Sequence, residues 1–430
     1  MAHRHNAVWE ADLASNLSRR DRRGGPYEAY VPDTVASRPV VTPPDLAQRA
    51  ANTERAIRAL ASRPGAAGLS GIARFLLRSE AIASSMIEGI APSPAQVAIA
   101  ELSHNEDVRG FSDQAALVAN NITVLRRATQ EMVSARELST ADIVSLHAAL
   151  LPNEQQHRGF RTVQNWIGGS NWHPLDADFV PPPHDEVPRL MTDLAVYLNG
   201  ATHGPLIQAG LAHAQFETIH PFTDGNGRVG RALIHTVMSR GGLAPDAILP
   251  ISMVLSTLSN DYVRGLSAYR YVGDALSDEA ADGTATWLTV FIDAAAVAVD
   301  QALGVSSDIA ALQEEWALQL RNHRVVAGLR AEPRANSASS RLLGMLPEAP
   351  VLTTKTVQRI LEVSFPSARA ALEELAAGGI LSRKSLDRGT TGYLARDVLD
   401  LIGLAERRLA STRFDTRVSK PVRSAPALPS

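Results

Sequence analysis

The sequence predicts a mainly α-helical protein: a large helical core, one β-hairpin and a small C-terminal helix-turn-helix unit with two strands. Three observations predict this. Apolar residues recur at helical spacing from about residue 46 to about residue 330. Residues 157–185 interrupt that spacing with short β-prone runs, glycines and three consecutive prolines. After a linker-like segment at 331–340, a second compact pattern fills residues 341–405.

Composition narrows the classes of protein. The chain has 430 residues, 45% hydrophobic and 20% charged, as in ordinary globular proteins. A net charge of -3 gives no overall attraction to nucleic acid, so such binding needs a local patch. The absence of cysteine excludes disulfides, thiolate metal sites and thiol nucleophiles. The N-terminus lacks the apolar segment of a secretory signal, and the most apolar run, residues 287–299, is shorter than a membrane span. We expect a cytoplasmic protein with no membrane partner.

The first 304 residues divide into two segments. Residues 1–45 are polar and proline-rich, so we expect an extended segment with few long elements. Residues 46–304 are expected to form the helical core, with one helix that begins near Leu69 and ends near Glu88. Within the core, residues 163–167 and 178–180 are predicted strands of a hairpin with a long tip, closed by prolines 181–183.

The remaining chain is expected to contain a connection, a second unit and a tail. Residues 305–340 are predicted as one long helix and a linker, and residues 406–430 as a polar tail. In the unit at 341–405, Thr354 is expected to cap one helix and Pro366 to begin the next. Strands are expected at residues 380–381 and 392–394. Residues 351–396 contain seven basic and four acidic residues. Their net charge of +3 gives a modest electrostatic attraction to DNA.

The densest chemistry lies at residues 220–231, His-Pro-Phe-Thr-Asp-Gly-Asn-Gly-Arg-Val-Gly-Arg, between two helical patterns. Glycines let backbone N–H groups turn inward, and a helix N-terminus adds positive potential, so the loop suits a phosphate. Arg228 and Arg231 lie side by side on one helical turn, and arginine forks suit nucleotide phosphates. Asp224 is a candidate Mg²⁺ ligand, and His220 is a candidate general base.

Four other interpretations of this loop can be compared with the sequence around it. The string Gly-x-Gly-x-x-Gly at 225–230 matches a dinucleotide fingerprint, which needs a preceding strand, whereas residues 215–219 have a helical pattern. His213, Glu217 and His220 have the spacing of a metal-binding helix face, but no His-Glu-x-x-His occurs. A plain helix connector explains the glycines but not two arginines beside an acid and a histidine. No Gly-Lys-Ser/Thr of a P-loop is present.

Residues 220–231 match in full the pattern H-P-F-x-D-G-N-G-R-x-x-R, and the chain thereby resembles the Fic (filamentation induced by cyclic AMP) family. The resemblance extends over about residues 26–300. It implies a helical fold with a β-hairpin flap and transfer of AMP from ATP to a Ser, Thr or Tyr hydroxyl of a target protein. By position, it makes His220 the general base and Asp224 the Mg²⁺ ligand. The nucleotide-binding residues are Gly225, Asn226 and Gly227 as the anion hole, Val229 and Gly230 beside it, and Arg228 and Arg231 on the β- and γ-phosphates.

A second segment resembles the family's inhibitory pattern [S/T]-x-x-x-E-[G/N], with Ser84, Glu88 and Gly89 in place. Gly89 lies where a helix C-cap glycine belongs. An acid at a helix C-terminus opposes the macrodipole, so Glu88 is expected to have a cationic partner. The resemblance implies that this partner is Arg231, which makes the enzyme self-inhibited.

The resemblance also suggests partners. A target protein is expected to add as a strand along the flap hairpin at 164–183. The C-terminal unit resembles a winged helix-turn-helix, which leaves DNA binding through residues 351–396 and a protein contact, including a homo-oligomer, both open. Two other functions stay open: removal of AMP or transfer of another phosphate-containing group, and a DNA-binding regulator that senses nucleotide.

Overall fold

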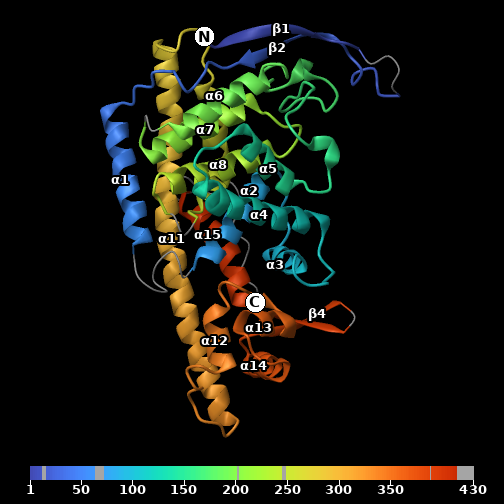
Figure 1. Cartoon of the computed structure of the whole chain (residues 1–430), viewed down its shortest axis with the longest axis vertical. Helices are drawn as coiled ribbons and strands as arrows, with labels where there is room; N and C mark the ends of the chain where they lie inside the picture. The colour runs from blue at the N-terminus through green and yellow to red at the C-terminus, as the bar shows by residue number, and fades with distance from the viewer. Residues whose placement is uncertain (12–15, 63–71, 201–202, 245–247, 388, 414–430) are drawn as a thin grey trace, which may run out of the picture. The chain divides into compact units, whose positions relative to one another are not determined.

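The computed structural model describes residues 1–430 other than 12–15, 63–71, 201–202, 245–247, 388 and 414–430. The chain divides into two compact units. The first unit contains Met1–Pro92 and Phe111–Val299, and the second contains Ser93–Gly110 and the chain from Asp300 onward. The described chain is mainly helical with small sheets of two and three strands, which confirms the mainly helical part of the predicted fold class (Figure 1).

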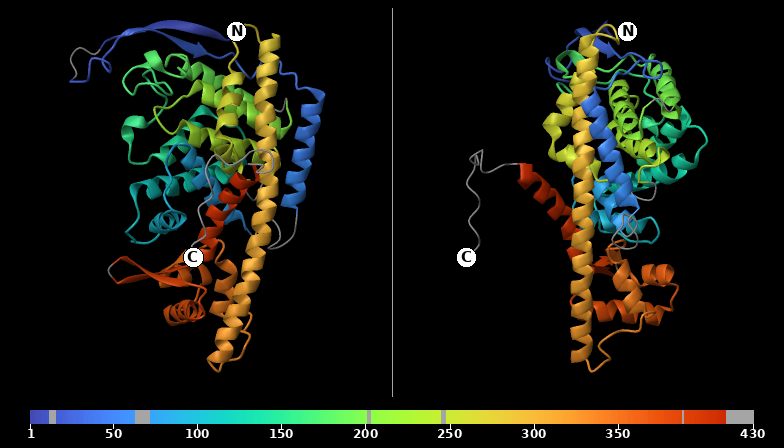
Figure 2. Two further views of the ribbon diagram at one scale, coloured as in Figure 1. Left: turned by 180° about the vertical axis from the view of Figure 1, so that it is seen from behind. Right: turned by 90° about the vertical axis from the view of Figure 1, so that its left-hand side faces the viewer.

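Two consecutive helices form the centre of the first unit. All but the first residue of α7 (Pro205–Ile219) and all but the last of α8 (Asn226–Arg240) are buried. Because both helices are enclosed on every side, neither needs a polar face. The surrounding helices of this unit are α1 (Pro44–Ala61), α2 (Ala73–Ile87), α4 (Asp113–Ser134), α5 (Thr140–Leu150), α6 (Val187–Asn199), α9 (Ile251–Thr257) and α10 (Ser259–Tyr269). Their arrangement can be followed in Figure 2.

The N-terminal segment contains more structure than expected. Strands β1 (His3–Trp9) and β2 (Gly25–Val31) pair antiparallel over seven positions, from His3 opposite Val31 to Trp9 opposite Gly25. The edge of β2 continues into the flap, because Tyr30 N–H donates to the carbonyl of Val180 at 2.9 Å. The hairpin was not predicted because its pairing joins residues on either side of a polar loop.

The flap contains less strand than expected. Only one antiparallel bridge forms, between Ile167 and Phe179, in place of the two strands predicted at 163–167 and 178–180. Polar side chains beside the bridge form hydrogen bonds with carbonyl groups outside it. Gln164 Nε2 donates to Pro181 O at 2.9 Å, and Asn165 Nδ2 donates to Phe222 O at 2.9 Å. The flap is therefore a loop attached to the body of the unit rather than a free-standing ladder.

The long helix begins earlier than expected. Helix α11 runs without a break from Asp278 to Val326, so the boundary predicted at residue 305 falls inside it. Buried apolar side chains continue through Trp287, Phe291 and Ile309 with no helix-breaking proline between them. By length and composition alone, α11 could cross a membrane: eighteen of its residues have a mean hydropathy of 1.6, and half of them are buried. Core helices have the same properties.

The second unit has a helical and a sheet part. Helices α12 (Ala338–Met345), α13 (Thr354–Leu361) and α14 (Phe365–Ala377) are followed by a hairpin of β4 (Ser382–Asp387) and β5 (Thr390–Leu394). Strand β3 (Val351–Leu352) completes a sheet of order β3-β5-β4. Thr353, rather than the expected Thr354, caps α13. The expected tail from residue 406 is still helical up to Arg413, in α15 (Arg396–Arg413), and its remainder lies outside the described residues.

One part of this unit comes from far away in the sequence. Helix α3 (Pro94–Ser103) and the following residues to Gly110 belong to the second unit. The carboxylate of Glu106 accepts hydrogen bonds from the hydroxyls of Thr353 and Thr356, at the first turn of α13. The domain division predicted from the sequence placed this segment in the core.

Candidate active site

The loop of residues 220–225 has two left-handed residues, one at each end. His220 ends α7 with φ of 50°, and Gly225 precedes α8 with φ of 77°. Asn226 fixes the loop between them, because its side chain accepts from Phe222 N–H and donates to Phe222 O, each at 2.8 Å. The loop is therefore a rigid turn that places an imidazole beside the N-terminus of α8. The helical structure of residues 215–219 also excludes the dinucleotide fingerprint, which needs a strand there.

The imidazole of His220 is held as a neutral base. Burial, reinforced by the Arg161 guanidinium, lowers its pKa to about 4. Its Nδ1 is buried and has no hydrogen-bond partner among the described residues. Arg161 also fixes the backbone, because its Nε donates to His220 O at 2.9 Å and its backbone N–H donates to Pro221 O at 2.8 Å. At neutral pH, His220 can therefore accept a proton.

The guanidinium of Arg228 has hydrogen-bond donors that no described residue accepts from. Its side chain is 3% exposed, and Nε and Nη1 are buried with no partner in the described part of the chain. Its Nη2 lies 3.6 Å from Asp224 Oδ2, and the Asp224 side chain is 52% exposed. Asp224 Oδ1 accepts from Gly225 N–H at 2.7 Å. Buried donors without acceptors are rare in folded proteins, so this guanidinium is arranged for an anion.

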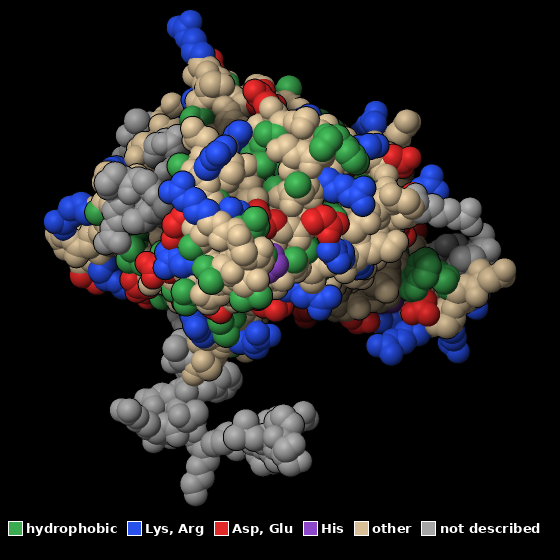
Figure 3. All heavy atoms as spheres, turned by 90° about the horizontal axis from the view of Figure 1, so that it is seen from below, with side chains coloured by type: hydrophobic (Ala, Val, Ile, Leu, Met, Phe, Trp, Pro, Cys, Tyr) green, Lys and Arg blue, Asp and Glu red, His purple; other side chains and the backbone are tan. Residues whose placement is uncertain are grey.

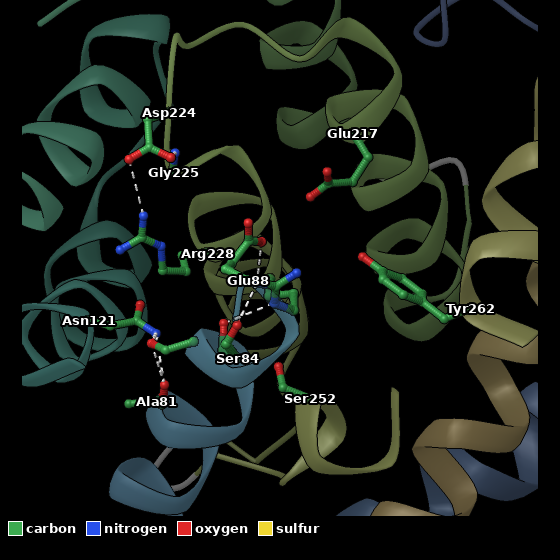
Figure 4. Close-up of polar contacts among 12 residues, drawn as sticks. Ala81, Ser84, Glu88, Asn121, Glu217, Asp224, Gly225, Arg228, Ser252 and Tyr262 are labelled. Carbon is green, nitrogen blue, oxygen red and sulfur yellow. Dashed lines mark hydrogen bonds and ion pairs between the residues drawn. The ribbon is translucent and has the colours of Figure 1, made fainter. Parts of the chain in front are cut away.

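Arg231 is already paired. The ion pair expected between Glu88 and Arg231 is present, with 2.8 Å between Glu88 Oε1 and Arg231 Nη2. Ser84 completes the contact, since its hydroxyl accepts from Arg231 Nε at 2.9 Å and its carbonyl from Nη2 at 2.7 Å. Burial opposes ionisation of Glu88, but Arg231 outweighs it and the pKa of Glu88 is lowered. Figure 4 shows Glu88 between Asp224 and Arg228 on one side and Glu217 and Tyr262 on the other.

Helix α2, which carries Ser84, is held in place by buried polar contacts. Glu80 is fully buried on the same face of α2 as Ser84, and its carboxylate lies 2.8 Å from His235 Nε2 of α8. It also accepts from the backbone N–H of Ser252 at 2.9 Å. Asn121 of α4 donates to the carbonyl of Ala81 at 3.1 Å. Gly89 follows the helix with φ of 77°, as a C-cap glycine does. These contacts fix the point from which Glu88 reaches α8.

A buried layer lies behind Arg231. His213 Nε2 contacts the Tyr262 hydroxyl at 2.8 Å, and burial lowers the pKa of His213 to about 3. Burial raises the pKa of Glu217 to about 7. Gly230 makes room for this acid, because a Cβ there would lie 2.4 Å from Glu217 Oε1. The described residues contain no group of three or more His, Cys, Asp and Glu side chains that could hold a metal.

Gly227 and Val229 complete the first turn of α8, and both are buried. A Cβ at Gly227 would lie 1.9 Å from Glu88 Oε1, so the carboxylate rests directly against the backbone of that turn. The acid thus covers the helix N-terminus where the resemblance places the anion hole. At Gly225 a side chain is disfavoured for two other reasons: the φ angle is positive, and a Cβ would lie 2.7 Å from Leu150 Cδ2.

Two residues of the site were missed by sequence reasoning. Arg161 precedes the flap and holds the carbonyls of His220, Val163 and Pro182 together. His147 Nε2 lies 3.0 Å from Asp224 O, and its ring stacks on Phe222 at 3.9 Å. Burial lowers the pKa of His147. Neither belongs to a local motif. The one sequence signal was the apolar neighbourhood of His147, whereas the residues around Arg161 are mostly polar.

Comparison with known proteins gives partial matches around this site. Residues 137–238 match the model of the Fic/DOC family. Protein adenylyltransferase fic-1 of Caenorhabditis elegans is 31% identical over 139 residues, which are 31% of this chain and 25% of that protein. Protein adenylyltransferase Fic of Drosophila grimshawi is 34% identical over 124 residues, which are 28% of this chain and 24% of that protein. The chain thus spans about a quarter of the length of the curated relatives it matches.

Solved structures give a weaker likeness. A crystal structure of a Fic family protein from Desulfovibrio desulfuricans G20 aligns with 83% of this chain and 98% of that chain. Its TM-score is 0.48 and its sequence identity 22%.

Proposed function

We propose, on the premise that residues 137–238 are a Fic/DOC domain, that this chain transfers AMP from ATP to a hydroxyl group of a protein. One observation carries the proposal. A neutral imidazole, a half-exposed carboxylate and a buried guanidinium with unused donors lie around one helix N-terminus, at His220, Asp224 and Arg228. Base, metal ligand and phosphate ligand are the groups that nucleotidyl transfer needs.

The chemistry follows from these positions. The oxygen of the target hydroxyl attacks the α-phosphorus of ATP while His220 takes the hydroxyl proton. The bond from the α-phosphorus to the oxygen bridging to the β-phosphate breaks, and pyrophosphate leaves. The unpartnered donors of Arg228 and the N–H groups of Asn226 and Gly227 stabilise the negative charge. Since the loop is rigid, most of the rate enhancement comes from positioning and charge.

Asp224 fits the metal that such a reaction uses. Magnesium binds proteins through one or two carboxylates and completes its shell with water and phosphate oxygens. A half-exposed carboxylate beside the phosphate site suits that role, and no larger set of protein ligands is required. Bound there, Mg²⁺ would neutralise charge on the phosphates.

The pair of Glu88 and Arg231 is an intramolecular brake in this proposal. Arg231 donates to Glu88 and to Ser84, so its guanidinium is engaged before a γ-phosphate arrives. ATP would then bind in a pose unsuited to transfer. Removal of the Glu88 carboxylate should free the second arginine.

Two radiolabels of ATP test the reaction type. With Glu88→Gly protein, the label is expected on protein from α-labelled but not from γ-labelled ATP, and neither label is expected after His220→Ala is added. Label from γ-labelled ATP would indicate phosphate transfer. Loss of AMP from protein already carrying it would indicate the reverse reaction.

A second activity is proposed for the second unit, because α13, α14 and the β4–β5 hairpin follow one another as in a winged helix. Lys355, Arg369 and Thr391 line a groove of about 280 Å³ beside the hairpin, together with the acids Glu106, Asp107 and Glu373. Figure 3 shows Lys and Arg side chains interspersed with Asp and Glu on the face that it presents. Weak, salt-sensitive DNA binding is expected. A gel shift at two salt concentrations tests it, and no shift at low salt would refute it.

A further inference from the structure

We propose that a groove between the N-terminal hairpin and the flap binds an extended, lysine- or arginine-rich segment of the protein substrate. This inference rests on the proposed function, and it names the class of substrate and a docking surface outside the catalytic loop. The groove encloses about 490 Å³. Its lining residues are His5, Ala7, Val8, Trp9, Glu10, Tyr27, Gln164, Pro183, His184 and Asp185.

The walls of the groove suit an extended chain. Val8 is 73% exposed, and Trp9 and Tyr27 are half-buried, so apolar surface is accessible along β1 and β2. Strand β1 pairs with β2 on one side. On its other side, among the described residues, its backbone makes no further strand pairing beyond the bridge from Ala2 to Gly273. Alternate residues of β1, namely His5, Ala7 and Trp9, line the groove, so an extended peptide can lie along this strand.

The flap connects one wall of the groove to the catalytic loop. Trp9 packs edge-on against Trp166 of the flap, with ring centroids 5.2 Å apart. Gln164 lines the groove, and the next residue, Asn165, donates to Phe222 O of the catalytic loop. Three residues before Gln164, Arg161 holds His220. A segment seated in the groove therefore lies beside a flap whose neighbouring residues contact the catalytic loop.

The charge of the lining selects the partner. Among the described residues, the charged lining residues are Glu10 and Asp185, both exposed, and neither lysine nor arginine lines the groove. Two carboxylates at an apolar groove attract lysine and arginine side chains and repel acidic segments.

The test measures binding of two fluorescein-labelled peptides to the full-length Glu88→Gly protein by anisotropy. Both peptides alternate valine with a charged residue around a central serine, lysine in one and glutamate in the other. The lysine peptide is expected to bind at least about tenfold more tightly. Glu10→Arg with Asp185→Arg should reduce its affinity by about tenfold and improve that of the glutamate peptide. Glu28→Arg is the control, because Glu28 is exposed on the same hairpin but does not line the groove.

The outcomes are distinct. Equal binding of both peptides, or equal loss of binding in Glu28→Arg, would overturn the groove assignment. AMP transfer to the serine of the same peptides is measured separately. Binding that depends on Glu10 and Asp185 without any transfer would support the groove and count against the proposed reaction alone.

Discussion

Replacement of Glu88 by glycine is expected to raise the rate of self-modification with AMP. In the structure, Glu88 Oε1 lies 2.8 Å from a guanidinium that is 1% exposed. The acid also lies against the first turn of α8, where a Cβ at Gly227 would be 1.9 Å from it. The substitution removes both the competing charge and the atom that covers the helix N-terminus. Arg231 and the backbone N–H groups then become available to phosphate.

The magnitude follows from the character of this pair. A hydrogen bond between charged groups contributes about 1.5–3 kcal/mol, and the Glu88 side chain is 31% exposed, so about 2 kcal/mol is a reasonable value. That free energy corresponds to about a 30-fold change in the population with Arg231 free. We therefore expect transfer to rise about 30-fold. Glu88→Gln should give a smaller rise, since the amide still covers the helix N-terminus.

The assay is the initial rate of AMP incorporation with saturating ATP and Mg²⁺, followed by labelled nucleotide. Glu186→Gln is the control, because it removes an equal charge from an exposed pair with Arg189 on the surface of the unit. Its rate should equal that of the unaltered chain. Equal rates for Glu88→Gly and the unaltered chain would refute the brake, provided that both bind ATP.

Three further predictions follow. Because burial lowers the pKa of His220 to about 4, the base stays neutral down to about pH 5.5, and transfer by Glu88→Gly should be flat from about pH 7.5 to that point. A rate that falls about tenfold over this range would indicate an ordinary histidine. Gly230→Ala should lower the free energy of unfolding by about 1–3 kcal/mol, since its Cβ would overlap Glu217, whereas Gly304→Ala, with open space around it, should raise it by about 0.5–1 kcal/mol. Urea denaturation measures both, and equal midpoints would contradict the packing argument. Arg161→Ala in the Glu88→Gly background should reduce kcat by about 100-fold with little change in ATP affinity, because its contacts hold the base and the flap rather than the nucleotide loop. A loss confined to ATP affinity would contradict this.

The features that the sequence predicted well are local. The loop from His220 to Arg231 is a run of consecutive residues, and its glycines and arginines have the positions that a helix N-terminus requires. The link from Glu88 to Arg231 spans 143 residues and was expected because the resemblance supplied it. Gly89 was placed by helix-capping chemistry alone.

The features that were missed depend on long-range contacts. Arg161 meets His220 across 59 positions, and no periodicity or spacing connects the two. The N-terminal hairpin pairs across a polar loop, and residues 93–110 join the second unit through Glu106 at a separation of about 250 positions. In the flap, all but one bridge of a predicted strand pairing is absent. Side chains of Gln164 and Asn165 form hydrogen bonds with the carbonyl groups of Pro181 and Phe222 in its place. Sequence pattern reports which residues favour a strand, but not which competing partners are near.

The most direct test of the central claim is the intact mass of the Glu88→Gly chain after incubation with ATP and Mg²⁺. A gain of one or more AMP masses is expected, with none after His220→Ala is added. An unchanged mass despite bound ATP, a gain of phosphate, or an AMP gain that persists without His220 would contradict the account.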